Sequence, residues 1–288
     1  MKKILFTGAC TALVTPFENG KLNFRMLGKL IERQRSAGIH TIVLGGTTGE
    51  SPTLSDGEKL KLFSEGKKQM DGGLTVCGTG SNDTRHAVAL SRAAEDSGAD
   101  ALLVVSPYYN KSTPQGLVEH YAAIASAVHI PVIIYNVPSR TGVDIPVDVY
   151  WKLSGIPNIA GVKEASTDVR KIGEIREQCP PDFGVWSGND DLTVPVMSLG
   201  GAGVISVVSN VAPGLTLDMT AAALNGDFDT AAALQTALAP LCRALFREVN
   251  PIPVKAAMEI LGFDCGAPRR PLTPATEETR RILKKLLT

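Results

Sequence analysis

Short, apolar, β-branched segments recur along the first two-thirds of the chain and limit the folds that it can adopt. On average about 28 residues separate one segment from the next, which is the length of a strand, a helix and the two loops that join them. Segments that are apolar throughout are typical of parallel strands, because helices cover one face and other side chains fill the opposite face. The eight segments span residues 9–14, 41–45, 75–78, 101–106, 131–136, 159–164, 184–187 and 203–208.

The stretches between these segments carry the signals of helix ends. Asn23 is a candidate N-cap, Ser55 and Glu58 have the spacing of a capping box, and Thr113 precedes a proline at a first helical position. Eight strands that alternate with helices predict the α/β class and a (β/α)₈ TIM barrel. An open, doubly wound sheet is the main alternative, and the lack of an early G-x-G-x-x-G motif disfavours it.

The pattern changes after residue 213, where no further strand is predicted and alanine-rich and leucine-rich helical stretches follow. We therefore expect a barrel with the catalytic site at residues 1–224 and a C-terminal α-helical domain at residues 225–288. The chain has no Gly- or Ser-rich linker between the two parts, so the helical part is expected to pack on the barrel.

Composition and residue spacing exclude several classes of function. The chain carries 29 Lys and Arg against 29 Asp and Glu, so it lacks the cationic excess that nucleic-acid binding needs. Its five cysteines form no C-x-x-C pair and its four histidines form no H-E-x-x-H pattern, which predicts no disulfide framework and no metal site. No apolar run reaches about 18 residues, and residues 2–6 (KKILF) lack the long apolar core of a leader peptide. We expect a cytoplasmic protein with no membrane or nucleic-acid partner.

Reactive groups in such a barrel stand at the carboxyl ends of the strands. Lys163 lies near the end of the sixth segment, where burial disfavours an ammonium and favours an amine that can attack a carbonyl. The alternative is a lysine that reaches solvent or pairs with Glu164. Tyr135 ends the fifth segment and suits proton transfer, although a core tyrosine fits the same pattern. Arg140, in the next turn, suits a bidentate hold on a carboxylate or is a solvated loop charge.

Two further turns carry candidate residues. The sequence GGTTGE at residues 45–50 brings backbone N–H groups and the hydroxyls of Thr47 and Thr48 into one loop, which suits an anion or is simply a tight turn that needs glycine. Tyr108 and Tyr109 close the fourth segment, where packing is the more common role of paired aromatic side chains.

Seven motifs, in this order, resemble those of the dihydrodipicolinate synthase family, within the pyruvate-dependent class I aldolases that include N-acetylneuraminate lyase. The double threonine, and Arg140 in its turn, resemble the synthase branch rather than the lyase branch. The motifs are GGTTGES at residues 45–51, SPYYN at 106–110, YNVPSRTG at 135–142, GVKEAS at 161–166, SGND at 187–190, GVISV at 203–207 and NPIPVK at 250–255.

The resemblance implies a Schiff-base lyase without a cofactor, which condenses pyruvate with L-aspartate 4-semialdehyde in the diaminopimelate route to lysine. It implies an imine between pyruvate and Lys163, and proton transfer by Tyr135, through Thr47, to a Tyr109 that the neighbouring subunit contributes. A homotetramer, built as a dimer of tight dimers, is implied as well. The implied substrate contacts are Thr48 to the pyruvate carboxylate, Arg140 to the carboxylate of the semialdehyde, and Gly188 and Ile205 in the pyruvate pocket.

One departure from the family concerns feedback by lysine. Lysine-inhibited relatives have a glutamate at the position of His86, which would pair with a ligand ammonium, and a histidine at that of Lys59. The missing anion predicts weak or absent inhibition of this chain. The positions that surround the inhibitor in such relatives correspond to Ser51, Pro52, Asp56, Lys59, Asn82, His86 and Tyr108.

Two alternatives remain open at this point. Another pyruvate-dependent lyase or aldolase on the same scaffold, acting on N-acetylneuraminate or a 2-keto-3-deoxy sugar acid, would keep Lys163 and Tyr135 and change the second substrate. A catalytically idle barrel that binds a ligand would form no covalent adduct with pyruvate.

Overall fold

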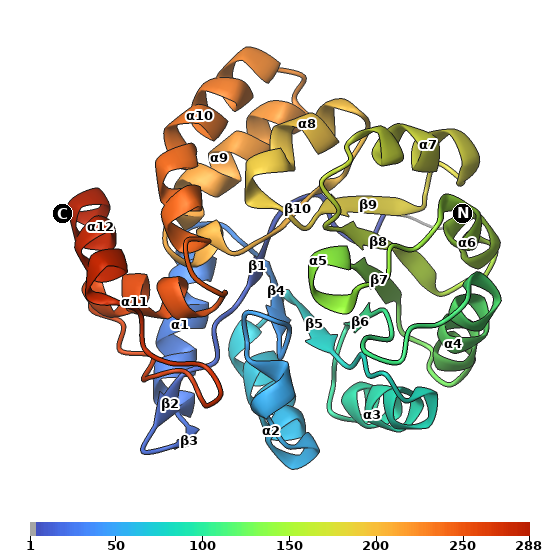
Figure 1. The fold of residues 1–288 in the computed structure, drawn as a ribbon, viewed down its shortest axis with the longest axis horizontal. Coiled ribbons are helices and arrows are strands. Elements are labelled where there is room, and N and C mark those ends of the chain that lie inside the picture. Colours follow the sequence, from blue (N-terminus) through green and yellow to red (C-terminus); the bar gives the residue numbers. More distant parts are fainter. Residues whose placement is uncertain (1–3) are drawn as a thin grey trace.

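Eight parallel strands close into a barrel in the computed structural model, which describes residues 4–288 (Figure 1). The last strand returns to pair with the first, and Gly203 stands beside Gly8. The predicted (β/α)₈ barrel is confirmed, and its closure rules out the open sheet. Lys2 and Lys3, at the start of the KKILF segment, lie outside the described residues. The barrel strands are β1 Gly8–Ala12, β4 Thr41–Leu44, β5 Leu74–Gly78, β6 Ala101–Val105, β7 Val132–Asn136, β8 Ile159–Glu164, β9 Gly184–Ser187 and β10 Gly203–Ser206.

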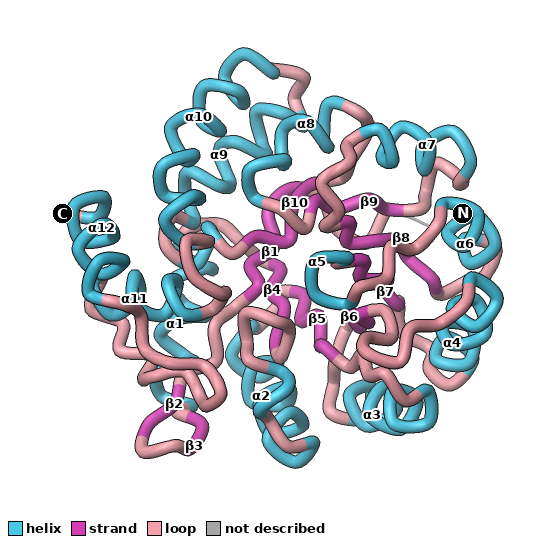
Figure 2. Tube along the Cα trace, viewed as in Figure 1, coloured by secondary structure: helices cyan, strands magenta, loops and turns pink. Residues whose placement is uncertain are grey.

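Helices form the outer layer around these strands (Figure 2). The Asn23 side chain accepts from the N–H of Met26, Ser55 and Glu58 form the reciprocal capping box, and Thr113 caps the helix that follows it. The predicted helix starts are thus confirmed. The outer helices are α1 Phe24–Ser36, α2 Asp56–Met70, α3 Thr84–Asp96, α4 Pro114–Ser126, α6 Val147–Ser154, α7 Arg170–Gln178, α8 Thr193–Ser198 and α9 Pro213–Leu224. Shorter elements are the hairpin of β2 Phe17–Glu18 and β3 Lys21–Leu22, the helix α5 Pro138–Thr141, and the 3₁₀ turns η1 Ser51–Thr53, η2 Asp190–Leu192 and η3 Val208–Asn210.

The interior of the barrel is a packed apolar core. Near its amino-terminal end the rings of Phe6 and Trp186 stack, with their centroids 4.7 Å apart. Val43, Val76 and Ile133 from three other strands are at most 1% exposed in the same cluster. Because side chains fill the barrel here, a polar site can form only at its carboxyl end.

The cysteines are all free and buried. None of the helices formed by residues 4–288 combines the length and the apolar character that a membrane crossing requires. The same residues contain no group of three or more His, Cys, Asp or Glu side chains arranged to hold a metal ion.

The chain ends in three further helices, which confirm the predicted helical extension. They are α10 Phe228–Leu245, α11 Ile252–Ile260 and α12 Glu277–Leu287. α10 packs against α8 and α9, and α12 packs against α10 and α11, on the side of the barrel where α1 lies (Figure 1). Residue 225 falls in the turn between α9 and α10, and the division into two domains there stays a prediction.

Candidate active site

Lys163 stands inside the carboxyl end of the barrel, on β8. It is 5% exposed, and its Nζ lies 4.4 Å from the centroid of the Tyr135 ring on the neighbouring β7. The alternative in which Lys163 pairs with Glu164 is wrong, because the Glu164 carboxylate turns to Lys171, 3.6 Å from its Nζ. Within residues 4–288, Lys163 forms no ion pair. A lysine without a counter-ion in a buried site is well placed for nucleophilic chemistry.

A small cavity of about 160 Å³ surrounds this lysine. Pockets for drug-sized ligands measure roughly 300–1,000 Å³, so this cavity suits a metabolite of a few heavy atoms. Six of the eight predicted site residues line it: Lys163, Tyr135, Thr47, Thr48, Arg140 and Gly188. Their individual roles stay predictions.

The other two predicted residues lie elsewhere. Ile205 is 1% exposed and packs in the barrel interior with Tyr135, and its side chain does not line the cavity. Tyr109 is 93% exposed and adopts a left-handed φ of 70°. A single chain therefore does not bring Tyr109 to Lys163, which is compatible with the expectation that a neighbouring subunit contributes it.

The loop after β4 holds Thr48 in a fixed position. Thr48 is 2% exposed, and its Oγ1 accepts a hydrogen bond of 3.0 Å from Nδ2 of Asn250. Thr15 Oγ1 donates to the carbonyl of Gly49 at 2.7 Å, which ties the same loop to the segment after β1. The hydroxyl of Thr48 can still donate to an anion in the cavity.

Gly188 forms a second close wall of the cavity. A Cβ at this position would lie 2.6 Å from the Cβ of Ala165. The backbone N–H of Gly188 donates to the carbonyl of Glu164 at 2.7 Å. Glycine is therefore needed here for the close approach of the loops that follow β8 and β9.

Asn250 is a further residue that lines the Lys163 cavity, and its spacing in the sequence predicts no role for it. It is 6% exposed, and its Oδ1 has no hydrogen-bond partner among residues 4–288. The backbone carbonyl of Asn250 accepts a hydrogen bond of 3.3 Å from the Arg140 guanidinium. The NPIPVK motif was the available signal for this residue, whereas nothing in the sequence indicated that Phe246, 44% exposed, also lines the cavity.

A second buried acid is Asp190, in the loop after β9, 6% exposed. Its carboxylate accepts from Ser206 Oγ and from the backbone N–H groups of Val207, at 2.9 Å, and Val208, at 3.3 Å. Burial raises the pKa of Asp190, while these hydrogen bonds and the charge of Lys163 act in the opposite direction. Asp190 therefore joins the ends of β9 and β10.

Comparison with known proteins shows the family to which the chain belongs. A model of the dihydrodipicolinate synthetase family matches residues 5–288. The 4-hydroxy-tetrahydrodipicolinate synthase of Acetivibrio thermocellus is 47% identical over 100% of this chain and 98% of its own length. The chain belongs to the dihydrodipicolinate synthetase family.

Solved structures of dihydrodipicolinate synthases agree with this assignment. The enzyme from Aquifex aeolicus superposes with a TM-score of 0.96 at 44% identity, covering 98% of this chain and 97% of its own. The chloride-inhibited enzyme from Acinetobacter baumannii, complexed with pyruvate, has a TM-score of 0.95 at 42% identity, covering 98% of each chain. The resemblance drawn from the seven motifs is confirmed, and so is the expectation of a lyase of the dihydrodipicolinate synthetase family.

A larger cavity of about 650 Å³ adjoins the first and shares Thr47, Tyr135 and Arg140 with it. The seven positions that correspond to the inhibitor site of lysine-sensitive relatives all line the larger cavity. His86 Nε2 lies 2.8 Å from Asp56 Oδ2, and burial lowers the pKa of Lys59. The structure thus brings these positions together, while the response to lysine stays a prediction.

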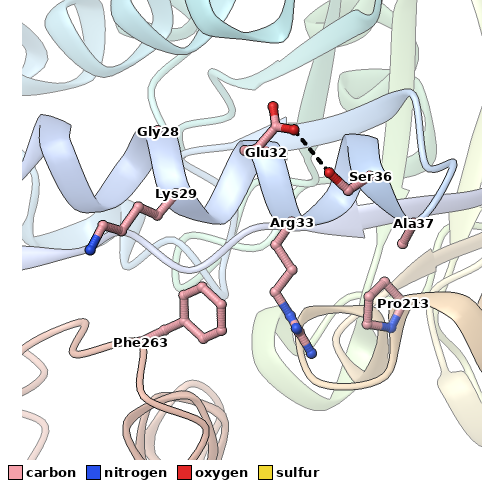
Figure 3. Close-up of a pocket in the computed structure, with 8 residues that line it drawn as sticks. All are labelled: Gly28, Lys29, Glu32, Arg33, Ser36, Ala37, Pro213 and Phe263. Carbon is pink, nitrogen blue, oxygen red and sulfur yellow. Dashed lines mark hydrogen bonds between the residues drawn. The ribbon is translucent and has the colours of Figure 1, made fainter.

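A surface groove lies between α1 and the side chains of Pro213 and Phe263 (Figure 3). The Arg33 guanidinium that borders it already donates to the carbonyls of Asn210 and Val211, and Ser36 donates to Glu32. Arg33 therefore ties α1 to the segment after β10, whereas the bond between Ser36 and Glu32 lies within α1 itself.

Proposed function

We propose that the chain is a 4-hydroxy-tetrahydrodipicolinate synthase that condenses pyruvate with L-aspartate 4-semialdehyde through an imine on Lys163. The observation that carries the proposal is the buried amine of Lys163, without an ion-pair partner in residues 4–288, 4.4 Å from the Tyr135 ring in a cavity of small-metabolite size. Family membership supports the choice of substrates and the place in lysine (diaminopimelate) biosynthesis.

The proposed reaction begins at the pyruvate carbonyl. The Lys163 amine adds to C2 of pyruvate, and loss of water forms the imine. The imine withdraws electrons, so the C3 methyl group loses a proton and an enamine forms. C3 of the enamine then attacks the aldehyde carbon of the second substrate. The amine of that substrate displaces the Lys163 nitrogen as the ring closes, which regenerates the free lysine. No cofactor and no metal ion enter the scheme.

Each proton transfer needs a group within hydrogen-bond reach of the reacting atoms. We assign this role to Tyr135, with Thr47 linking it to Tyr109 of the partner subunit. The exposed ring of Tyr109, beside a Tyr108 that is 37% exposed, supports a contact with another copy of the chain. We therefore infer a homotetramer, a dimer of tight dimers, as the active form, and light scattering of the purified protein tests it.

The substrate carboxylates have separate proposed partners. Thr48 and nearby backbone N–H groups would hold the carboxylate of pyruvate, and the exposed Arg140 at the cavity rim would hold that of the semialdehyde. Gly188 and the backbone of Ile205 would bound the pyruvate pocket. The free, buried cysteines support a reducing, cytoplasmic location.

Borohydride reduction in the presence of pyruvate, followed by peptide mapping, tests the proposed function. We expect one reduced pyruvate on the peptide that contains Lys163. Labelling of another residue, or of none, would overturn the mechanism. Turnover of N-acetylneuraminate or a 2-keto-3-deoxy sugar acid at or above that of L-aspartate 4-semialdehyde would reject the proposed substrate.

We further propose that lysine inhibits this enzyme weakly or not at all. The larger cavity presents Lys59 and His86, and the nearest carboxylate, that of Asp56, is already engaged by His86. Among Asp56, Lys59 and His86, only Asp56 has a carboxylate, and His86 already occupies it. A ligand ammonium would therefore find no free carboxylate among them. A steady-state assay with added lysine is the test, and half-maximal inhibition at micromolar to submillimolar lysine would contradict the proposal.

A further inference from the structure

Glu164, the residue after Lys163, carries a buried carboxylate on the outer side of the barrel. Side chains alternate across a strand, so Lys163 points into the cavity and Glu164 points away from it. On β7 the same alternation separates Tyr135 from Asn136. The strand register pairs Tyr135 with Lys163, and Asn136 with Glu164. Each member of the reactive pair therefore has an outward neighbour, and these two neighbours stand side by side.

The Glu164 carboxylate has four polar partners from four segments of the chain. Its Oε1 accepts from Asn136 Nδ2 and from the backbone N–H of Ser166, both at 2.8 Å. Its Oε2 accepts from the Tyr150 hydroxyl at 3.0 Å and lies 3.6 Å from the Lys171 ammonium. The carboxylate thus joins the end of β7, the loop after β8, α6 and α7, and its side chain is 2% exposed.

A second carboxylate extends this network. Asp144 accepts from Asn136 Nδ2 at 2.8 Å and from the Lys171 ammonium. The carbonyl oxygen of the Asn136 side chain accepts in turn from the backbone N–H of Ile145 at 3.1 Å. Asn136 and Lys171 are therefore held on both sides, so a change in Glu164 is transmitted to the chain that surrounds the end of β7.

The backbone of the same stretch builds the wall of the active site. The N–H of Ala165 donates to the carbonyl of Asn136 at 2.9 Å, and that of Gly188 donates to the carbonyl of Glu164 at 2.7 Å. Ala165 and Gly188 both line the Lys163 cavity, whereas Glu164 does not. Movement of the Glu164 backbone would therefore shift the cavity wall and the lysine together.

We propose that Glu164, with Asn136 and Lys171, is a positioning residue that sets Lys163 against Tyr135. The inference rests on the proposed function, because it concerns the geometry of imine formation. Glu164 acts through the adjacent strand ends rather than on the substrate. A displacement of about 1 Å in a catalytic group can lower a rate by up to 100-fold, so a tie of this kind has a measurable effect on catalysis.

The test measures the rate of imine formation. Each protein is mixed with saturating pyruvate and quenched with borohydride at timed intervals. Intact-mass spectrometry then measures the fraction of protein that carries the reduced adduct. Asn136→Ala and Tyr150→Phe each remove one partner of Glu164, and we expect each to slow adduct formation, by about tenfold for Asn136→Ala. The half-saturating pyruvate concentration should stay near the wild-type value, because neither variant replaces a residue that lines the Lys163 cavity and Thr48 keeps its hydroxyl.

Tyr121→Phe is the matched control. Tyr121 is as buried as Tyr150, on the neighbouring helix α4, and its hydroxyl donates a single hydrogen bond to the carbonyl of Val104 at 3.2 Å. We expect Tyr121→Phe to lose about as much thermal stability as Tyr150→Phe, but to form the adduct at the wild-type rate. Lys171→Met should also slow adduct formation, because it leaves the buried Glu164 carboxylate without an ammonium. Adding Glu164→Gln removes that negative charge and should restore most of the lost rate.

The outcomes separate this inference from the proposed function. If wild-type protein forms no adduct on Lys163, the proposed function fails and the inference fails with it. If wild type reacts and Asn136→Ala and Tyr150→Phe react equally fast, only the inference is overturned. Equal slowing by Tyr121→Phe would also overturn it, since the effect would then follow general loss of packing.

Discussion

Replacement of Gly188 by alanine tests whether the wall beside Lys163 shapes the pyruvate pocket. The added Cβ would lie 2.6 Å from the Cβ of Ala165, whereas carbon atoms in favourable contact are about 3.5–4.0 Å apart. The two loops must therefore separate by about 1 Å. Overpacking of this kind costs about 1–3 kcal/mol. At about 2–4 °C per kcal/mol for a chain of this size, we expect the unfolding temperature to fall by about 2–12 °C.

The same substitution should weaken the binding of pyruvate. We expect Gly188→Ala to raise the KM for pyruvate about tenfold or more, because the wall moves relative to Lys163. Ala165→Gly removes the carbon that the new Cβ would strike, so the double variant should recover most of the lost affinity. Thermal unfolding and steady-state kinetics with varied pyruvate are the assays. A wild-type KM in Gly188→Ala, or a double variant no better than the single one, would refute the argument.

Three further predictions concern other parts of the molecule. Tyr109→Phe should lower turnover far more than it slows pyruvate adduct formation, and full activity would remove Tyr109 from the mechanism. Lys255→Met should lower the free energy of unfolding by about 3–5 kcal/mol in a denaturant titration, because it strands Glu50, whose side chain is 0% exposed and 2.8 Å from the ammonium. The double variant with Glu50→Gln should lose less, and equal losses would contradict the buried-pair explanation. Burial lowers the pKa of His120 to about 4, so the unfolded state binds more protons between pH 6.5 and 4. Stability should therefore fall by up to about 3 kcal/mol as the pH drops through that window, and His120→Gln should flatten this part of the curve of unfolding free energy against pH.

Much of the architecture followed from local sequence patterns. Strand and helix periodicity is encoded within a few residues, so the eight apolar segments and the caps at Asn23, Ser55 and Thr113 were predictable from composition and spacing. The same logic placed Lys163 and Tyr135 at strand ends, where a barrel gathers its reactive groups. The roles of Thr47, Thr48 and the other site residues came instead from the resemblance of their motifs.

The partners of these residues depend on how distant segments pack. Asn250 reaches Thr48 across 202 positions of sequence, and no local pattern encodes a contact of that range. Whether Lys163 pairs with Glu164 or faces the cavity likewise depends on the packing of α6 and α7. Tyr150 of α6 and Lys171 of α7 are partners of the Glu164 carboxylate, so Lys163 is left without it. Local sequence patterns thus specify the order of strands and helices and the chemical character of their ends. Closure of the barrel and the docking of the C-terminal helices decided which of those ends share a cavity, since such contacts form only when distant segments pack together.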